Sequence, residues 1–188
     1  NEDICDGLIS FFEESDKKKP GAIGAGVNED FKVSTDVTVI PRNPDSRIQD
    51  YLGELSDVCK EYILKYPWSS TNQDVWGLNT NFNIQKYNPS EAFFGWHTER
   101  STMSDLVATR HLVFMTYLNT VTDGGETEWF HQQIKIQPRK GLTVMWPVDW
   151  THVHRGVPSK TQTKYITTGW YTYTVSYTHL RAHETQTH

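Results

Sequence analysis

The hydrophobic period of this chain changes from helical to strand-like at Pro67, and this change constrains the fold more than any other feature. Over residues 45–66 apolar side chains recur every three or four positions, which predicts an amphipathic helix that ends before the proline. A shorter helix is predicted over residues 4–12, where the spacing is also helical and a KKKPG segment follows. Beyond Pro67 the segments alternate apolar and polar residues, as half-buried strands do.

Turn sequences divide the strand-like part of the chain, notably TDGG at residues 122–125 and PRKG at residues 138–141. The predicted strands are 37–40, 81–87, 95–99, 111–119, 126–130, 133–137, 142–147, 151–155 and 164–175. Two helices ahead of a series of short strands predict a mainly β fold, a sandwich or barrel with helices on one side. The length of 188 residues suits a single domain, which we place at residues 1–175.

Charge and composition exclude several classes of function. The net charge is −5 and no basic run exceeds the KKK at residues 17–19, so nucleic-acid binding is not expected. No apolar stretch is long enough to cross a membrane, and the acidic start NEDICD lacks the basic flank of a signal peptide, so a cytoplasmic location is expected. Cys5 and Cys59 lie among apolar residues of the predicted helices and are expected to be reduced core thiols.

Residues 176–188, SYTHLRAHETQTH, differ from the rest of the chain. They are polar and follow neither hydrophobic period, so we expect an unstructured tail. The segment also resembles translated sequencing-adapter read-through, and on the hypothesis that it is not native its three histidines are excluded from the candidate site. A source gene that contains these codons would contradict this hypothesis.

The segment WHTER raises the question of a metal site. His97 and Glu99 are two residues apart, so in an extended strand both side chains would project from the same face. A His-x-Glu pair alone is weak evidence, but a further histidine would complete the two-His, one-carboxylate set of non-haem Fe(II) sites. The segment THVHR offers His152 and His154, and as a regular strand it would present both on one face. The residues alone leave open which of the two binds.

Other polar residues have more ordinary interpretations. Arg100, Arg110 and Arg155 are expected to be ion-pair partners, the usual role of scattered arginines, and Arg155 is also a candidate contact for an anionic substrate group. His111 begins an apolar strand and is expected to be a core or rim histidine with its hydrogen bonds satisfied. His131 lies at a predicted hairpin turn, where it would face solvent or contact substrate.

Four motifs make a specific resemblance. WHTER, RHLVFMTYLNTVTDGGETEWF, QPRKGLTVMWP and HRGVPSKTQTKYITTGWY occur in this order between residues 87 and 171. They resemble the prolyl 4-hydroxylase-like branch of the 2-oxoglutarate- and Fe(II)-dependent dioxygenases. The resemblance implies a double-stranded β-helix, or jelly-roll, barrel with two N-terminal helices. It also implies Fe(II) as cofactor, 2-oxoglutarate and O₂ as co-substrates, and ascorbate as a candidate reductant.

The resemblance assigns roles to individual residues. Its metal ligands fall on His97, Glu99 and His154, because the distal histidine of the family lies ten residues before a lysine, here Lys164. That lysine is expected to bind the far carboxylate of 2-oxoglutarate. The other residues expected in the co-substrate pocket are Tyr87, Thr127 and Trp170.

Two positions depart from the family pattern. Glu99 stands where Asp is commoner, so its longer side chain must fold back to reach the same metal position. Tyr87 lies ten residues before His97, where the prolyl hydroxylases usually have nine, which predicts a loop or bulge between them.

The last predicted strand gives independent support for a ligand at its lysine. In an extended strand the even positions share one face, and here they carry Lys164, Ile166, Thr168, Trp170 and Thr172. A lysine on such a core-like face is costly unless a carboxylate meets it, and no acidic partner is evident nearby. A bound dicarboxylate would supply that charge.

The predicted function is an Fe(II)- and 2-oxoglutarate-dependent dioxygenase that hydroxylates an unactivated C–H bond and releases succinate and CO₂. A peptidyl proline is one candidate substrate, and a free amino acid or small metabolite is another, because the fold alone does not choose between them. The alternative from a different class is a non-enzymatic, cupin-like metal- or ligand-binding module. The expected partner is thus a peptide, a protein or a small molecule, and neither nucleic acid nor a membrane.

Overall fold

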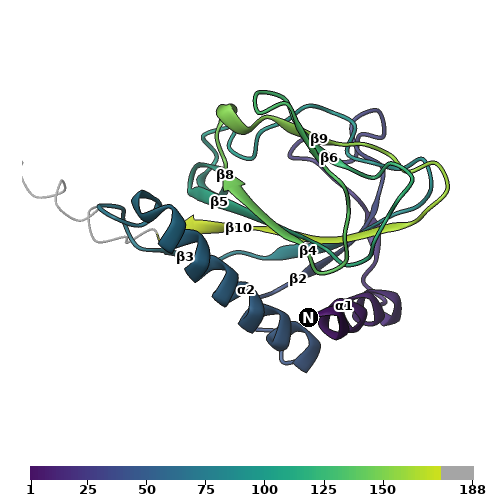
Figure 1. Cartoon of the computed structure of the whole chain (residues 1–188), viewed down its shortest axis with the longest axis horizontal. Coiled ribbons are helices and arrows are strands. Elements are labelled where there is room, and N and C mark those ends of the chain that lie inside the picture. Colours follow the sequence, from purple (N-terminus) through teal and green to yellow (C-terminus); the bar gives the residue numbers. More distant parts are fainter. Residues whose placement is uncertain (175–188) are drawn as a thin grey trace, which may run out of the picture.

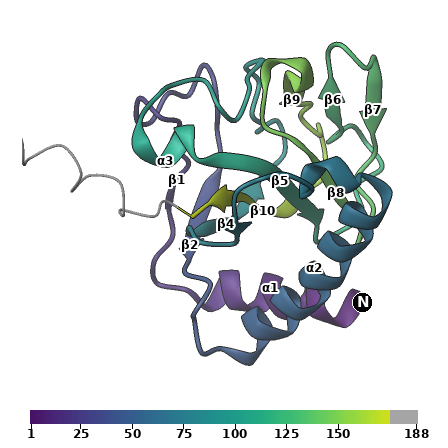
Figure 2. The same cartoon turned by 90° about the vertical axis from the view of Figure 1, so that its left-hand side faces the viewer.

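The computed structural model describes residues 1–174 and shows a large sheet with two helices along one face and a smaller sheet opposite the other (Figure 1). The helices are α1 (Glu2–Glu14) and α2 (Ser46–Lys65), and Figure 2 shows them side by side beneath the large sheet. Both sheets are antiparallel. The prediction of a mainly β, double-stranded β-helix fold with N-terminal helices is therefore confirmed, whereas the prediction for residues 176–188 lies outside the described residues.

The large sheet has the strand order β1-β2-β4-β10-β5-β8, with β3 paired to β10, and the small sheet has the order β7-β6-β9. The strands of the large sheet are β1 (Lys19–Pro20), β2 (Thr35–Val39), β3 (Trp76–Gly77), β4 (Phe82–Tyr87), β5 (Arg110–Tyr117), β8 (Thr143–Pro147) and β10 (Lys164–Tyr173). The small sheet consists of β6 (Thr127–Trp129), β7 (Ile134–Ile136) and β9 (His154–Gly156). The short helical segments are η1 (Pro67–Ser69), α3 (Asp105–Ala108) and η2 (Trp150–His152).

Local chemistry explains where the two long helices begin and end. The side chain of Asn1 accepts a hydrogen bond from the Asp3 backbone N–H, and Asp45 does the same for Arg47, which satisfies N–H groups that the helix leaves free. Helix α2 ends at its cap residue directly before Pro67, as the sequence predicts. Among the helices of residues 1–174, none combines the length and apolar composition that a bilayer crossing requires.

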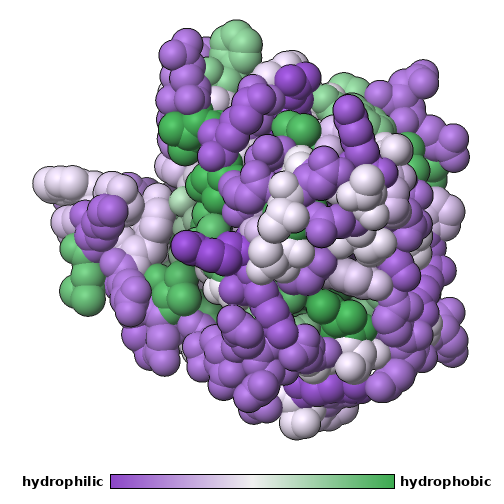
Figure 3. All heavy atoms as spheres, turned by 45° about the vertical axis from the view of Figure 1, so that its right-hand side comes forward, coloured by the Kyte–Doolittle hydropathy of each residue, from purple (hydrophilic) through white to green (hydrophobic). Residues whose placement is uncertain are grey.

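Alternation along the strands gives the molecule two apolar cores. On β5, Leu112 and Phe114 face the helices, whereas Val113, Met115 and Tyr117 face the space between the sheets. The helices contribute the buried residues Cys5, Leu8, Phe12, Ile48, Tyr51, Leu55 and Cys59. Both cysteines are free and buried, as predicted. On the face drawn in Figure 3 the surface is mostly hydrophilic, with hydrophobic side chains in small separate patches.

A matched pair of leucines tests how much the helix core contributes to stability. Leu8 is 0% exposed in α1, and Leu64 is 82% exposed near the end of α2. Leu8→Ala is expected to lower the free energy of unfolding by about 2–5 kcal/mol, because it leaves a cavity between helix and sheet. Leu64→Ala should change it by no more than about 0.5 kcal/mol. Urea denaturation of both variants measures the difference, and equal losses would contradict this assignment of the core.

Two predicted strands are wrong. Residues 95–99 form an irregular segment, because their backbone groups bond in turn to Phe31, His154 and Val148 rather than to one neighbouring strand. Gly95 is needed there, since a Cβ would lie 2.2 Å from the Phe31 ring. Residues 151–155 are divided between η2 and β9. β4 ends at Tyr87, and the residues between it and His97 form no helix or strand.

Candidate metal centre and its cavity

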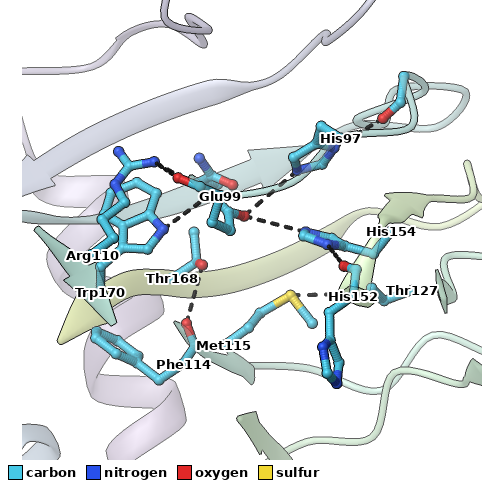
Figure 4. Close-up of polar contacts among 12 residues, drawn as sticks. His97, Glu99, Arg110, Phe114, Met115, Thr127, His152, His154, Thr168 and Trp170 are labelled. Atoms are coloured by element: carbon cyan, nitrogen blue, oxygen red, sulfur yellow. Dashed lines mark hydrogen bonds and ion pairs between the residues drawn. The ribbon is translucent and has the colours of Figure 1, made fainter. Parts of the chain in front are cut away.

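Three side chains converge between the two sheets: His97, Glu99 and His154 (Figure 4). Each offers a ligand atom, and these atoms all lie within 4.8 Å of one another. The Glu99 Oε1 atom is 3.2 Å from His154 Nε2 and 3.6 Å from His97 Nε2. Reciprocal backbone hydrogen bonds of 3.0 Å join His97 to His154. Folding therefore brings together the three residues that the sequence proposes as ligands.

Backbone carbonyls fix the tautomer of both imidazoles. The Nδ1 atom of His97 lies 2.9 Å from the carbonyl oxygen of Gly95, and that of His154 lies 2.9 Å from the carbonyl oxygen of His152. A carbonyl only accepts, so each Nδ1 carries the proton and donates it. Each Nε2 faces Glu99 and is the atom through which the imidazole would bind a metal.

Glu99 is held from its outer side by two residues of the large sheet. Its Oε2 atom accepts a hydrogen bond from Trp170 Nε1 at 3.0 Å and lies 3.6 Å from Arg110 Nη1. The same guanidinium donates to the Glu99 backbone carbonyl at 2.7 Å and stacks 3.6 Å from the centre of the Trp170 ring. The outer oxygen is thus occupied, and Oε1 remains free for the interior.

The electrostatics of the cluster keep Glu99 ionised. Burial raises the pKa of this carboxyl group, but the hydrogen bonds with His154 and His97 outweigh it, so the pKa lies well below its usual value. A carboxylate must be deprotonated to bind a metal. The three side chains therefore offer a metal two imidazole nitrogens and one carboxylate oxygen.

His152, the alternative to His154, lies outside the cluster. It is the last residue of η2, and Figure 4 shows its ring directed away from Glu99. Its Nδ1 atom is 3.0 Å from the hydroxyl of Thr151. The short helical turn removes the alternation that would have placed both histidines on one face.

The cluster opens into a cavity of about 980 Å³ between the sheets. All the predicted site residues line it: His97, Glu99, His154, Lys164, Tyr87, Thr127 and Trp170. Along β10 the alternation holds for Lys164, Ile166, Thr168 and Trp170, which all face the cavity. Thr172, the next even position, does not line the cavity, and there the register with β5 shifts, since Tyr171 pairs with Leu112 and Thr172 with Arg110.

Lys164 lies in the cavity, and no carboxylate in residues 1–174 forms a salt bridge with it. It is 5% exposed, and its Nζ donates to the Gly125 carbonyl at 3.0 Å and lies 4.9 Å from the centre of the Tyr87 ring. Desolvation lowers the pKa of its ammonium group to about 8, partly offset by Glu126. The other cavity cations have acidic partners: Lys32 with Asp36, Arg110 with Glu99 and Arg155 with Glu128.

The remaining predicted residues occupy different parts of the cavity. The Thr127 hydroxyl accepts a hydrogen bond of 2.7 Å from Tyr117. The Tyr87 hydroxyl donates to Gln85 at 2.8 Å, beside Lys164. Trp170, expected in the co-substrate pocket, lines the cavity and directs its N–H at Glu99.

Sequence reasoning found the ion-pair role of Arg100, Arg110 and Arg155 but missed that Arg110 acts on a candidate ligand. It also missed Gln85. A signal for Gln85 exists, because β4 alternates and Gln85 must share the inward face of Tyr87.

Residues 82–172 match the protein family described as the 2OG-Fe(II) oxygenase superfamily, where 2OG is 2-oxoglutarate. No match to a curated protein was found.

Several solved structures share the fold. A collagen prolyl hydroxylase from Paramecium bursaria Chlorella virus-1, in its 2OG complex, is 18% identical, with 93% of this chain and 92% of that chain covered and a TM-score of 0.66. A Pseudomonas putida prolyl-4-hydroxylase is 16% identical, with 93% and 89% covered and a TM-score of 0.68. A prolyl hydroxylase from Trichoplax adhaerens, in complex with a peptide fragment of the hypoxia inducible factor oxygen degradation domain, is 14% identical, with 90% and 76% covered and a TM-score of 0.71.

Proposed function

Because residues 82–172 belong to the 2OG-Fe(II) oxygenase superfamily, we propose that this protein is a dioxygenase that hydroxylates an unactivated C–H bond of a peptide. Family membership implies Fe(II) and 2-oxoglutarate. One observation carries the proposal: the two-His, one-carboxylate cluster shares its cavity with a buried lysine that lacks an acidic partner among the described residues.

The donor set fits Fe(II). His97 and His154 would bind through their Nε2 atoms and Glu99 through Oε1, which matches the ligand set of non-haem Fe(II) oxygenases and leaves positions for co-substrate and oxygen. Bound Fe(II), with 2-oxoglutarate and O₂, supplies an oxidation that adds one oxygen atom to the substrate and releases succinate and CO₂. Arg110 and Trp170 hold the carboxylate in place from behind.

The opposite end of the cavity fits the co-substrate. Lys164 would form an ion pair with the far carboxylate of 2-oxoglutarate, and Thr127 and Tyr87 line the same cavity. The pair would neutralise the charge that burial now disfavours on Lys164, and it would orient the molecule with its other end toward the metal.

The cavity rim supports a peptide substrate. Trp96 lines the cavity. The centre of its ring lies 5.3 Å from the ring centre of Phe130 and 4.4 Å from the Arg155 guanidinium. Phe130 is 56% exposed, so an aromatic surface continues outward from the site. Extended peptides commonly dock on such aromatic surfaces. The solved structures of similar fold are prolyl hydroxylases, and we therefore propose a peptidyl proline as the target.

A succinate-release assay tests the proposal. The protein with Fe(II), ascorbate and 2-oxoglutarate should form succinate slowly alone and faster with proline-containing peptides. If an amino acid or metabolite stimulates succinate formation and no peptide does, the proposed peptide substrate is contradicted. Binding of Fe(II) and 2-oxoglutarate without succinate formation across the panel would instead favour the cupin-like binding module.

The support that Trp170 gives to Glu99 is testable with another tryptophan as control. Trp170→Phe keeps an aromatic ring but removes the N–H donated to Glu99, and it is expected to weaken Fe(II) binding about 10-fold. Trp150→Phe should leave binding unchanged, since Trp150 is 71% exposed on η2. Titration with Fe(II) under anaerobic conditions measures both. Equal affinities would show that the hydrogen bond does not position the carboxylate.

A further inference from the structure

Arg155, at the rim of the cavity, has hydrogen-bond donors that the protein itself does not use. The residue follows His154 on β9 and lines the cavity, and its side chain is 38% exposed. A guanidinium group has five N–H donors, and here the one at Nε is bonded to Glu128 Oε2 at 3.1 Å. Neither Nη atom donates a hydrogen bond to a group within residues 1–174. The donors at both Nη atoms therefore remain available to a ligand.

Two neighbours hold the guanidinium of Arg155 in place. Trp96 lies beside it, with 4.4 Å between the guanidinium carbon and the centre of the indole ring. An aromatic face orients a guanidinium group without using any of its N–H donors. Glu128 fixes the same group through Nε. The edge formed by the two Nη atoms is thus ordered before a ligand arrives, which reduces the conformational entropy lost on binding.

The charges around Arg155 do not cancel. In the register of the small sheet Glu128 pairs with Arg155 on one side and with Lys135 on the other, and its Oε1 atom lies 3.4 Å from Lys135 Nζ. Burial raises the pKa of Glu128, but Arg155 and Lys135 outweigh this effect, so the pKa lies below its usual value and the carboxylate is charged at neutral pH. Two positive charges and one negative charge leave one net positive charge, in a protein whose overall charge is −5.

We propose that Arg155 is a specificity-determining residue that binds a carboxylate of the substrate. The enzyme then prefers peptides with an aspartate or glutamate close to the target proline. A carboxylate can accept two parallel hydrogen bonds from the guanidinium fork, and it neutralises the surplus charge that Glu128 leaves. This inference rests on the proposed function, because it concerns how the peptide is chosen at the same site.

Two series of proline-containing peptides form the test. In one series a single glutamate is moved stepwise along both sides of the proline, and in the other series glutamine takes its place. KM and kcat for peptide-dependent succinate formation are measured for the wild type, Arg155→Gln and Glu128→Gln, and melting temperatures are recorded alongside. Arg139→Gln is the matched control, because Arg139 is exposed and does not line the cavity.

The two variants should change the preference in opposite directions. In the wild type, glutamate at the favoured position should lower KM about 5-fold relative to glutamine, as a well-formed ion pair at a partly exposed site does. Arg155→Gln should remove this preference. Glu128→Gln should raise it to about 10-fold, because it removes the carboxylate that competes for the guanidinium. A merely structural role predicts the same effect from both variants, since each breaks the same ion pair.

Three outcomes overturn the inference while peptides still stimulate succinate formation. The first is an equal KM for glutamate and glutamine peptides at every position, and the second is a preference that survives in Arg155→Gln. The third is a loss of preference in both variants, or in Arg139→Gln as well. If Arg155→Gln does not fold, Arg155→Met takes its place. Absence of succinate formation with every peptide would instead overturn the proposed peptide substrate, and this inference with it.

Discussion

His154→Ala is expected to lower Fe(II) affinity and succinate formation by more than about 100-fold, beyond the 10- to 100-fold loss typical when only a supporting group is removed. The residue begins β9, is 5% exposed and directs Nε2 at Glu99 from 3.2 Å. Its removal leaves one imidazole and one carboxylate, which cannot complete the three-ligand set. Anaerobic Fe(II) titration and the succinate assay give the two readouts.

His152→Ala is the matched control, because this histidine lies two residues away and its ring does not reach the cluster. Its backbone carbonyl, which orients His154, remains in the variant. The control should bind Fe(II) as the wild type does. Retained Fe(II) binding in His154→Ala, or its loss in His152→Ala, would reverse the assignment of the third ligand.

Lys164→Met is expected to weaken 2-oxoglutarate binding by at least about 100-fold. Removing one partner of a buried ion pair costs about 3–5 kcal/mol, and each 1.4 kcal/mol is tenfold in affinity. The unliganded protein should at the same time become more stable at pH 7, since methionine fills a similar volume without a desolvated charge. Lys60→Met, at a side chain that is 70% exposed, should change neither property. Unchanged 2-oxoglutarate affinity in Lys164→Met would rule out its role.

The same lysine should make 2-oxoglutarate binding depend on pH. Burial lowers the pKa of Lys164 from 10.5 to about 8, so the ammonium form that pairs with a carboxylate is lost from the free protein as pH rises through 8. Affinity should then fall by up to about tenfold per pH unit, and this trend should be absent in Lys164→Met.

The stability of the unliganded protein should change with pH in the opposite direction to its 2-oxoglutarate affinity. Between pH 8 and 10.5 the unfolded chain binds more protons at Lys164 than the folded one, so this residue adds stability as pH rises. The stability advantage of Lys164→Met over the wild type should therefore shrink across that window, as urea denaturation at several pH values would show.

The parts of the fold that local patterns specify could be predicted from the sequence. The helix expected over residues 45–66 is found at Ser46–Lys65, because its amphipathic period, its cap and its proline are all local. The alternation of β10 holds from Lys164 to Trp170 for the same reason. The segment around His97 was expected to be a strand and is not, since its backbone partners come from three distant segments that no local period encodes.

In the candidate site, too, some features could be predicted from the sequence and others could not. The pair His97 and Glu99 is readable, because metal chemistry limits which residue types can be ligands, whereas the residues alone left His152 and His154 open and the family resemblance selected His154. The contact of Arg110 and Trp170 with Glu99 is not readable, because it arises from the pairing of β5 with β10. This contact also shows what the longer side chain of Glu99 does: its Oε2 atom reaches Trp170 and Arg110 while its Oε1 atom faces the histidines.

Reciprocal backbone hydrogen bonds join His97 to His154. The conformational entropy of ordering these two segments is therefore lost when the chain folds, not when a metal binds. Two segments more than fifty residues apart along the chain are joined by peptide groups, independently of any ion. The order that a metal would otherwise have to impose is thus already present in the folded chain. Iron would enter a preorganised site, unlike the ions of small domains that fold only when loaded.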